Sequence, residues 1–182
     1  VKYVTDFSSN TLLPASLFTD VWNQDNWHIY EYKDALPRAF LTSSYIVETD
    51  PQKILDRIFG GVSALTLEEQ PQIEHSEVPT GSARIEVYTP NSVTTAVHPI
   101  QDTLLFLSDT YYPGWNAYID GKKAKIYRAN YAFRAVEISQ DAHVVEFRYE
   151  PQSFRWGIII SLASIVAGFY WWYRYRLEMY AS

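Results

Sequence analysis

Hydrophobic residues run without a charged interruption through positions 156–173, which read WGIIISLASIVAGFYWWY. At about 1.5 Å per residue, a helix over this segment is roughly 27 Å long, close to the ~30 Å of a bilayer core. Aromatic residues lie at both ends, as in the interfacial belts of membrane-spanning helices. The pattern predicts a transmembrane helix over 153–178, and the alternative is a buried core helix of a soluble protein.

Four small residues recur on one face of this predicted helix: Gly157, Ser161, Ser164 and Gly168. Small side chains allow neighbouring transmembrane helices to approach closely. The stripe therefore predicts packing against upstream transmembrane helices of the same protein. The alternative is that these side chains face membrane lipid by chance.

Positive charges flank the apolar segment on both sides. Arg174 and Arg176 follow it and favour a cytoplasmic C-terminal tail, which places the preceding domain outside the cell membrane. Arg148 and Arg155 on the other flank weaken this orientation.

The residues before this helix alternate between apolar and polar, which predicts short β-strands separated by turns. The predicted strands are 1–5, 26–33, 38–47, 84–89, 103–108, 116–120, 123–127, 133–138 and 143–149. Asp120-Gly121 is typical of a hairpin turn because both residues tolerate positive φ. Residues 50–59 read as a soluble helix, with Asp50 as its N-cap and Pro51 in its first turn.

These elements predict a mainly β fold, an antiparallel β-sandwich of jelly-roll-like type, with one short soluble helix and a C-terminal transmembrane helix. We expect a small mixed β/α part over 1–80, a sandwich part over 81–152 and the membrane helix over 153–178. The acidic segment 68–80 contains prolines and reads as a loop or linker. The alternative is that the first two parts form one domain.

Composition narrows the classes of function. The 182 residues carry 15 Lys and Arg against 21 Asp and Glu, so the net charge is -6 and a nucleic-acid partner is not expected. There is no cysteine, which excludes disulfides and thiol catalysis. The four histidines lack the spacing of a zinc site, and no nucleophile or phosphate-loop motif is present. We therefore expect no catalytic residue, no metal and no cofactor in this chain.

Export of an outward-facing domain raises a separate expectation. The chain begins at Val1 without the pattern of a secretory signal, so such a domain would depend on segments upstream.

Aromatic and hydrogen-bonding side chains concentrate in residues 109–115, which leave the strand 103–108 through a Pro-Gly turn, and in residues 128–134, which read as a loop. These candidate contact residues are Asp109, Tyr112, Trp115, Arg128, Asn130, Tyr131 and Arg134. Aromatic rings stack on the apolar faces of sugars, and arginine pairs well with phosphate. The set predicts a contact surface for a glycan or a lipid phosphate.

A structural role for the same residues is the alternative. In that interpretation Trp115 caps the core and Pro113-Gly114 forms a turn. Arg128 then pairs with Asp109 or Asp120.

Four phrases resemble the C-terminal region of the YfhO family of bacterial polytopic membrane proteins. They are VKYV at 1–4, ALPRAF at 35–40, LLFLSDTYYPGWNAYIDGKKAKIYRANYAFRAVEI at 104–138 and VVEFRYEPQSFRWG at 144–157. The third is the most specific, because its Tyr-Pro-Gly-Trp turn, Asp-Gly hairpin and Arg-Ala-Asn run rarely coincide. The segment from about 48 to 80 carries the least resemblance.

The resemblance implies an extracytoplasmic domain in a relative of the GT-C glycosyltransferases. Such enzymes take a lipid-phosphate-linked sugar and place their acidic catalytic residue in an early loop that this chain does not contain. The implied role is that of an accessory domain in cell-envelope polysaccharide or teichoic-acid glycosylation. Its implied partners are membrane lipid, upstream helices and a glycan or polyprenyl-phosphate sugar. The alternative is a structural or protein-interaction module with no sugar-binding role; a free-standing hydrolase is disfavoured because no catalytic constellation is visible.

Overall fold

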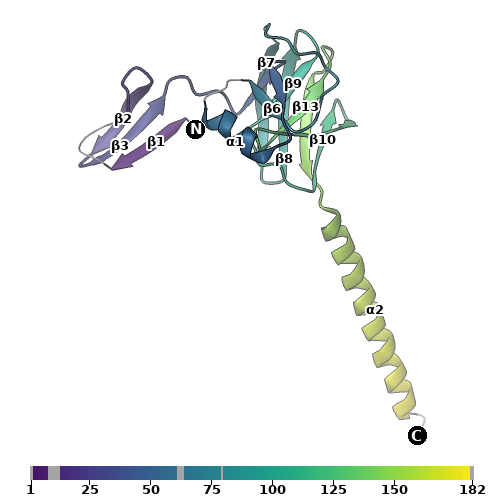
Figure 1. Cartoon of the computed structure of the whole chain (residues 1–182). Coiled ribbons are helices and arrows are strands. Elements are labelled where there is room, and N and C mark those ends of the chain that lie inside the picture. Colours follow the sequence, from purple (N-terminus) through teal and green to yellow (C-terminus); the bar gives the residue numbers. More distant parts are fainter. Residues whose placement is uncertain (1, 8–12, 61–63, 79, 181–182) are drawn as a thin grey trace.

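The computed structural model describes residues 2–7, 13–60, 64–78 and 80–180. Figure 1 shows three parts: a small N-terminal sheet, a β-sandwich beside it, and a long C-terminal helix. The helix extends away from the sandwich, and its described residues pack against neither of the other parts. The mainly β fold with antiparallel sheets and one apolar C-terminal helix confirms the predicted fold class.

The elements in chain order are β1 (Tyr3–Phe7), β2 (Phe18–Gln24), β3 (Trp27–Tyr32), β4 (Ala39–Thr42), β5 (Tyr45–Val47), α1 (Pro51–Phe59), β6 (Leu65–Leu67), β7 (Gly81–Thr89), β8 (Ser92–Pro99), β9 (Thr103–Leu107), β10 (Trp115–Ile119), β11 (Lys122–Ala124), β12 (Tyr127–Ala129), β13 (Phe133–Ile138), β14 (Val144–Tyr149) and α2 (Gln152–Tyr180).

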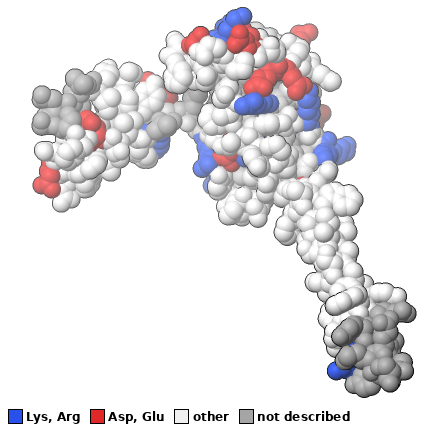
Figure 2. Space-filling model, turned by 60° about the horizontal axis from the view of Figure 1, so that its bottom comes forward, with Lys and Arg blue, Asp and Glu red and all other residues white. Residues whose placement is uncertain are grey.

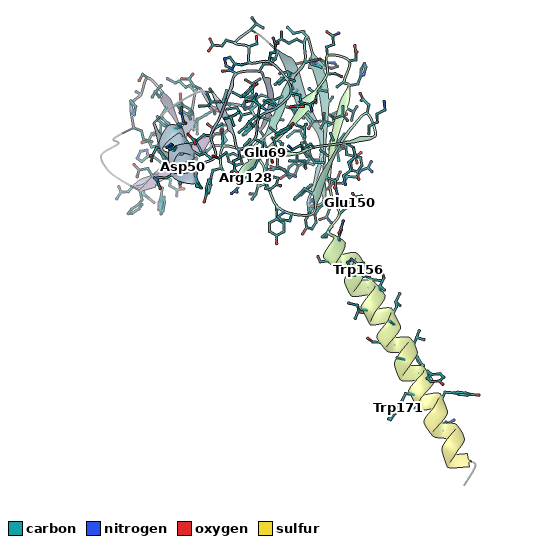
Figure 3. The ribbon with its side chains drawn as sticks, turned by 45° about the vertical axis from the view of Figure 1, so that its right-hand side comes forward. Asp50, Glu69, Arg128, Glu150, Trp156 and Trp171 are labelled. Atoms are coloured by element: carbon teal, nitrogen blue, oxygen red, sulfur yellow. The ribbon has the colours of Figure 1, made fainter. Side chains whose placement is uncertain are left out.

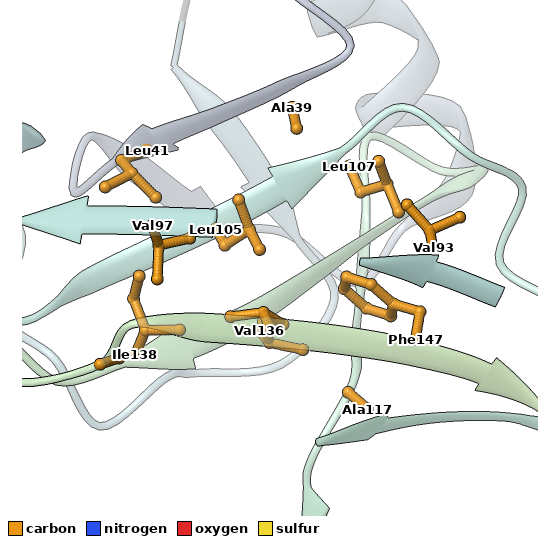
Figure 4. Packing of buried hydrophobic residues seen from close by; sticks show 12 residues of the cluster. Ala39, Leu41, Val93, Val97, Leu105, Leu107, Ala117, Val136, Ile138 and Phe147 are labelled. Atoms are coloured by element: carbon orange, nitrogen blue, oxygen red, sulfur yellow. The ribbon is translucent and has the colours of Figure 1, made fainter. Parts of the chain in front are cut away.

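Two sheets form the sandwich. One has five strands in the order β11-β10-β14-β8-β7, and the other has six in the order β4-β9-β13-β12-β6-β5. Their paired strands are antiparallel except for β5 and β6. Leu105 and Val136 of the six-stranded sheet meet Val93, Val97 and Phe147 of the five-stranded sheet in the core (Figure 4). Apolar residues facing inward at every second position therefore hold the two sheets together.

Strand β9 is buried on both faces, which explains its continuous apolar sequence. Leu105 faces the core between the sheets, whereas Leu104 and Phe106 pack on the outer face. The segment 68–76 helps to cover that outer face, where the Tyr45 hydroxyl donates to the Ile73 carbonyl oxygen at 2.7 Å. This segment lacks regular structure, but it packs on the sheet.

Strands from both sides of residue 80 lie in one sheet. Strands β4, β5 and β6 precede that residue, and they join β9, β12 and β13 in the six-stranded sheet. The division of the chain at residue 80 stays a prediction, and the shared sheet favours the one-domain alternative for everything except β1–β3.

Both helices occur where the sequence predicts them. The Asp50 carboxylate accepts a hydrogen bond from the Gln52 backbone N–H at 2.9 Å and so caps α1. In α2, the segment Gln152–Tyr173 is long and apolar enough to cross a membrane, and none of its described side chains is buried in the protein. Figure 2 shows an uncharged surface along most of this helix. This exposure does not fit the alternative of a buried core helix.

Tyr127 in β12 gives the sandwich a predicted response to alkaline pH. Its hydroxyl donates to Glu137 Oε1 at 2.9 Å, and burial, reinforced by Glu137, raises the pKa of Tyr127 from 10.0 to about 12. The folded state holds this proton more tightly than the unfolded state. The resulting stabilisation is complete below pH 10 and is lost between pH 10 and 12.

We expect the free energy of unfolding of the wild type to fall relative to Tyr127→Phe by roughly 1.4 kcal/mol between pH 9 and pH 11. Urea titrations of both proteins at the two pH values measure this difference. A parallel pH dependence of the two proteins would contradict it.

Candidate functional site beside the start of the membrane helix

A pocket of about 470 Å³ opens at the end of the sandwich from which α2 leaves. The ends of β7, β9 and β14 and the starts of β10 and β13 form its walls. Tyr149 in its wall is only three positions before Gln152, the first residue of α2. Figure 3 shows Glu150 at this end of the sandwich, next to the helix. The pocket therefore lies beside the start of the membrane helix.

A buried ion pair lies at the base of this pocket. Arg134 Nη2 lies 3.0 Å from Asp109 Oδ2, and the two side chains are 1% and 8% exposed. On its other oxygen Asp109 accepts a hydrogen bond from Arg38 Nε at 2.8 Å. Two guanidinium groups thus share one carboxylate, which leaves the pocket with one net positive charge from these three side chains.

Arg134 is enclosed by aromatic rings. Its guanidinium carbon is 4.1 Å from the ring centre of Trp115 and 5.1 Å from that of Phe147. Burial lowers the pKa of the Arg134 guanidinium, and the neighbouring Asp109 opposes that shift. Its Nε and Nη1 atoms are buried without a hydrogen-bond partner, so the ring faces and Asp109 provide their compensation. Arg134 therefore positions Asp109 and Trp115 and is not itself accessible to a ligand.

Arg38 is the arginine that a ligand can reach. Its side chain is 52% exposed, and its Nη2 donates to the Tyr88 hydroxyl at 2.7 Å. Together with the bond to Asp109, this contact fixes the guanidinium at the pocket rim. The sequence-based candidates omit Arg38, although it lies in the ALPRAF phrase that carries part of the family resemblance.

Aromatic side chains form the wall between the pocket and α2. The ring of Tyr149 is 5.5 Å from that of Trp115 and 6.4 Å from that of Tyr112, which is 60% exposed. Gly114 turns the chain between these residues with φ of 105°, and its carbonyl oxygen accepts from the Glu150 backbone N–H at 2.7 Å. The wall is therefore fastened to the residues that lead into the membrane helix.

Three of the seven candidate residues lie outside this pocket. Arg128 Nε donates to the Tyr131 carbonyl oxygen at 2.5 Å and lies 3.2 Å from Glu68. Asn130 accepts from the Thr66 backbone N–H at 2.9 Å, which fastens β6 to β12. Arg128 thus pairs with Glu68 and not with an aspartate at 109 or 120, which corrects that expectation. Asp109, Tyr112, Trp115 and Arg134 are the four candidates that the structure brings together.

The small-residue stripe on α2 lies open along the helix. The hydroxyls of Ser161 and Ser164 donate to carbonyl oxygens one turn earlier, both at 2.8 Å. A Cβ added at Gly157 or Gly168 would meet no atom within 4 Å. Packing of this face against upstream helices stays a prediction.

A second depression of about 970 Å³ lies near the start of β9 and the end of β13, at the opposite end of these strands. Its lining includes Glu74, Asp102 and Glu137 but no lysine or arginine. Such a lining repels phosphate. Within the described ranges, no three histidine, aspartate or glutamate side chains are grouped closely enough to hold a metal ion. The pocket with Arg38 is thus the better candidate for an anionic or sugar ligand.

Comparison with known proteins gives a family match. The family model described as bacterial membrane protein YfhO matches residues 63–161, which run from the edge of β6 through the sandwich into α2. The chain belongs to the YfhO family. A relative from Bacillus subtilis (strain 168), described as uncharacterized protein YfhO, is 34% identical over 76 residues. No solved structure matches the chain significantly.

The matched segment is 42% of this chain but only 9% of the Bacillus subtilis YfhO relative. Family membership and α2 together identify the chain as part of a bacterial membrane protein.

Proposed function

We propose that this YfhO-family chain is the extracytoplasmic accessory domain of a multi-pass membrane glycosyltransferase. Its pocket would hold the phosphate or sugar headgroup of a polyprenyl-phosphate-linked donor. The reaction class comes from the family resemblance in the sequence, and the ligand class comes from the pocket. Cell-envelope polysaccharide or teichoic-acid glycosylation is the proposed setting.

The exposed, oriented guanidinium of Arg38 is the observation that carries the proposal. Asp109 and Tyr88 hold it at 2.8 and 2.7 Å, so its orientation is fixed before a ligand arrives. A preorganised arginine forms strong charge-assisted bonds to phosphate. The pocket lies beside the first residues of the membrane helix, where the headgroup of a lipid is within reach.

The aromatic wall supports a sugar on the same ligand. Tyr112 is exposed and Trp115 half-buried, and both rings line the pocket. Aromatic faces combine a large apolar surface with polar edges, which suits the two sides of a sugar ring. Arg38 would bind the phosphate while this wall contacts the attached sugar.

The proposed orientation places the sandwich outside and the end of α2 inside the cell. Arg174 and Arg176 follow the apolar segment and match the excess of positive charge on the cytoplasmic side of membrane helices. A lipid-linked sugar donor displayed on the outer leaflet would then lie on the same side as the pocket.

We expect Arg38→Ala to weaken binding of a polyprenyl-phosphate hexose about tenfold or more, as for loss of a hydrogen bond to a charged group. The measurement is a titration of the complete chain in nanodiscs, followed by microscale thermophoresis. Arg84→Ala is the matched control, because Arg84 is an exposed arginine of β7 outside the pocket. Equal affinity of both variants, or no binding by the folded wild type, would contradict the proposal.

A structural or protein-interaction module is the second candidate function. The supporting observation is that Arg128, Asn130 and Arg134 all make contacts that hold the sandwich together. Absence of binding by a folded wild type in the same titration would favour this candidate.

A further inference from the structure

The N-terminal sheet β1-β3-β2 has two chemically different faces. Paired residues of adjacent strands share a face, so the register puts Phe7 opposite Trp27 and Trp22 opposite Ile29 on one side. The other side carries a polar group in which His28 Nδ1 lies 2.8 Å from Asp20 Oδ2. We call the first side the aromatic face.

The aromatic face is open to solvent. Its four aromatic side chains are 46–61% exposed: Tyr3, Phe7, Trp22 and Trp27. Tyr3 and Phe7 are four residues apart on β1, which is about 13 Å along a strand. The rings of Phe7 and Trp27 are 4.7 Å apart and extend this surface to the next strand. Thr5, Gln24 and Glu31 lie beside the rings on the same face and supply hydrogen-bonding groups.

The negative charge of the N-terminal sheet restricts which partners can bind the aromatic face. Over residues 2–34, which contain β1–β3 and their connections, the two lysines Lys2 and Lys33 are outnumbered by five carboxylates, Asp6, Asp20, Asp25, Glu31 and Asp34, which gives a net charge of −3. Acidic side chains are visible on this part of the molecule in Figure 2. An anionic lipid surface would repel this sheet, and so would the same sheet of a second copy. An uncharged partner fits the charge of this region better.

We propose that the aromatic face binds an uncharged glycan chain. Pyranose rings offer apolar faces that stack on Trp22, Trp27 and Tyr3, and their hydroxyl groups bond to the interspersed polar side chains. The length of the face accommodates more than one sugar ring. This site is separate from the pocket with Arg38. Glycan binding at the aromatic face is therefore tested independently of donor binding in the pocket.

The test measures binding of cellohexaose and chitohexaose to the complete chain in nanodiscs by isothermal titration calorimetry. We expect saturable binding of at least one of them, and a loss of roughly tenfold or more in affinity in Trp27→Ala, as at a central stacking position. Phe59→Ala is the control, because Phe59 is an aromatic residue of α1 that is 85% exposed but lies outside the face. That variant should bind as the wild type does. Arg38→Ala should also bind these sugars normally, which separates this site from the pocket.

Three outcomes would overturn the inference. The first is no binding of either sugar by a wild type whose circular dichroism shows a folded β-protein. The second is equal loss in Trp27→Ala and Phe59→Ala. The third is that spin-labelled lipid in the nanodisc quenches the fluorescence of Trp22 and Trp27. The double variant Trp22→Phe/Trp27→Phe identifies that part of the signal, because it lacks both tryptophans. Such quenching would mean that the aromatic face contacts the bilayer.

Discussion

Replacing Asp109 with alanine should destabilise the sandwich by about 3–5 kcal/mol, because it leaves the Arg134 charge buried without its partner. The Arg134 side chain is 1% exposed, so water cannot take the place of the carboxylate. Folded domains are stable by only about 5–15 kcal/mol, so this loss is a large part of the total. Urea denaturation of the complete chain in detergent, followed by far-ultraviolet circular dichroism, measures the change.

Two companion variants show whether the ion pair causes this effect. Asp141→Ala removes an exposed carboxylate and should change stability by less than about 0.5 kcal/mol. Asp109→Leu/Arg134→Met replaces the pair with apolar side chains and should recover most of the lost stability. A loss below about 1 kcal/mol in Asp109→Ala would show that Arg134 finds another partner.

Donor binding should fall in both variants at Asp109, although only Asp109→Ala loses much stability. Both variants remove the carboxylate that orients Arg38, so both should weaken binding of the polyprenyl-phosphate hexose. The double variant should do so while remaining folded. Asp109 thus links the stability of the core to the geometry of the pocket rim.

The elements that sequence periodicity predicts are those with a regular inward and outward alternation. Strand β14 is the clearest example, since Val145 and Phe147 face the core as its pattern indicates. Strand β2 was not predicted, because the register shift between Asp20 and Trp22 breaks its two-residue period. Strand β6 has three residues, which is too few for a periodic signal.

The sequence pattern of strand β8 does not indicate a strand either, but for a different reason. Its inward positions include Thr95, which is fully buried between Val93 and Val97. A threonine at a core position weakens the contrast between the two faces in the sequence. Only the pairing of β8 with β7 and β14 shows that this strand lies inside its sheet.

The candidate site was predicted in part, and the missing part depends on sheet order. Asp109 and Arg134 meet because β9 and β13 are antiparallel neighbours, with Leu107 opposite Arg134. Asp109 directly follows one predicted strand and Arg134 lies at the start of another, so local sequence patterns were enough to select both residues. Arg38 is 71 positions from Asp109 and reaches it because β4 pairs with β9 on the other side. Local patterns carry no information about that pairing.

Gly114→Ala should lower stability by about 2–4 kcal/mol, from backbone strain together with overpacking. Gly114 has φ of 105°, a conformation that L-residues rarely adopt. An added Cβ would lie 2.9 Å from Tyr149 Cε2 and 3.3 Å from Pro151 Cα. One of these neighbours must move, and both connect the pocket wall to the first turn of α2. Denaturant titration measures the loss of stability, and the donor titration measures the expected loss of affinity.

Gly121→Ala separates crowding from backbone strain. Gly121 also has a positive φ, 81°, in the β10–β11 turn, but an added Cβ there would meet no atom within 4 Å. This variant should lose only about 1–2 kcal/mol, the cost of the left-handed conformation alone, and should bind donor as the wild type does. If both glycine variants lost equal stability and neither changed donor binding, crowding against Tyr149 and Pro151 would have no effect on stability or on the pocket. Because the wall residues continue directly into α2, a selective effect at Gly114 would show that the pocket depends on the packing of the residues that lead into the membrane helix.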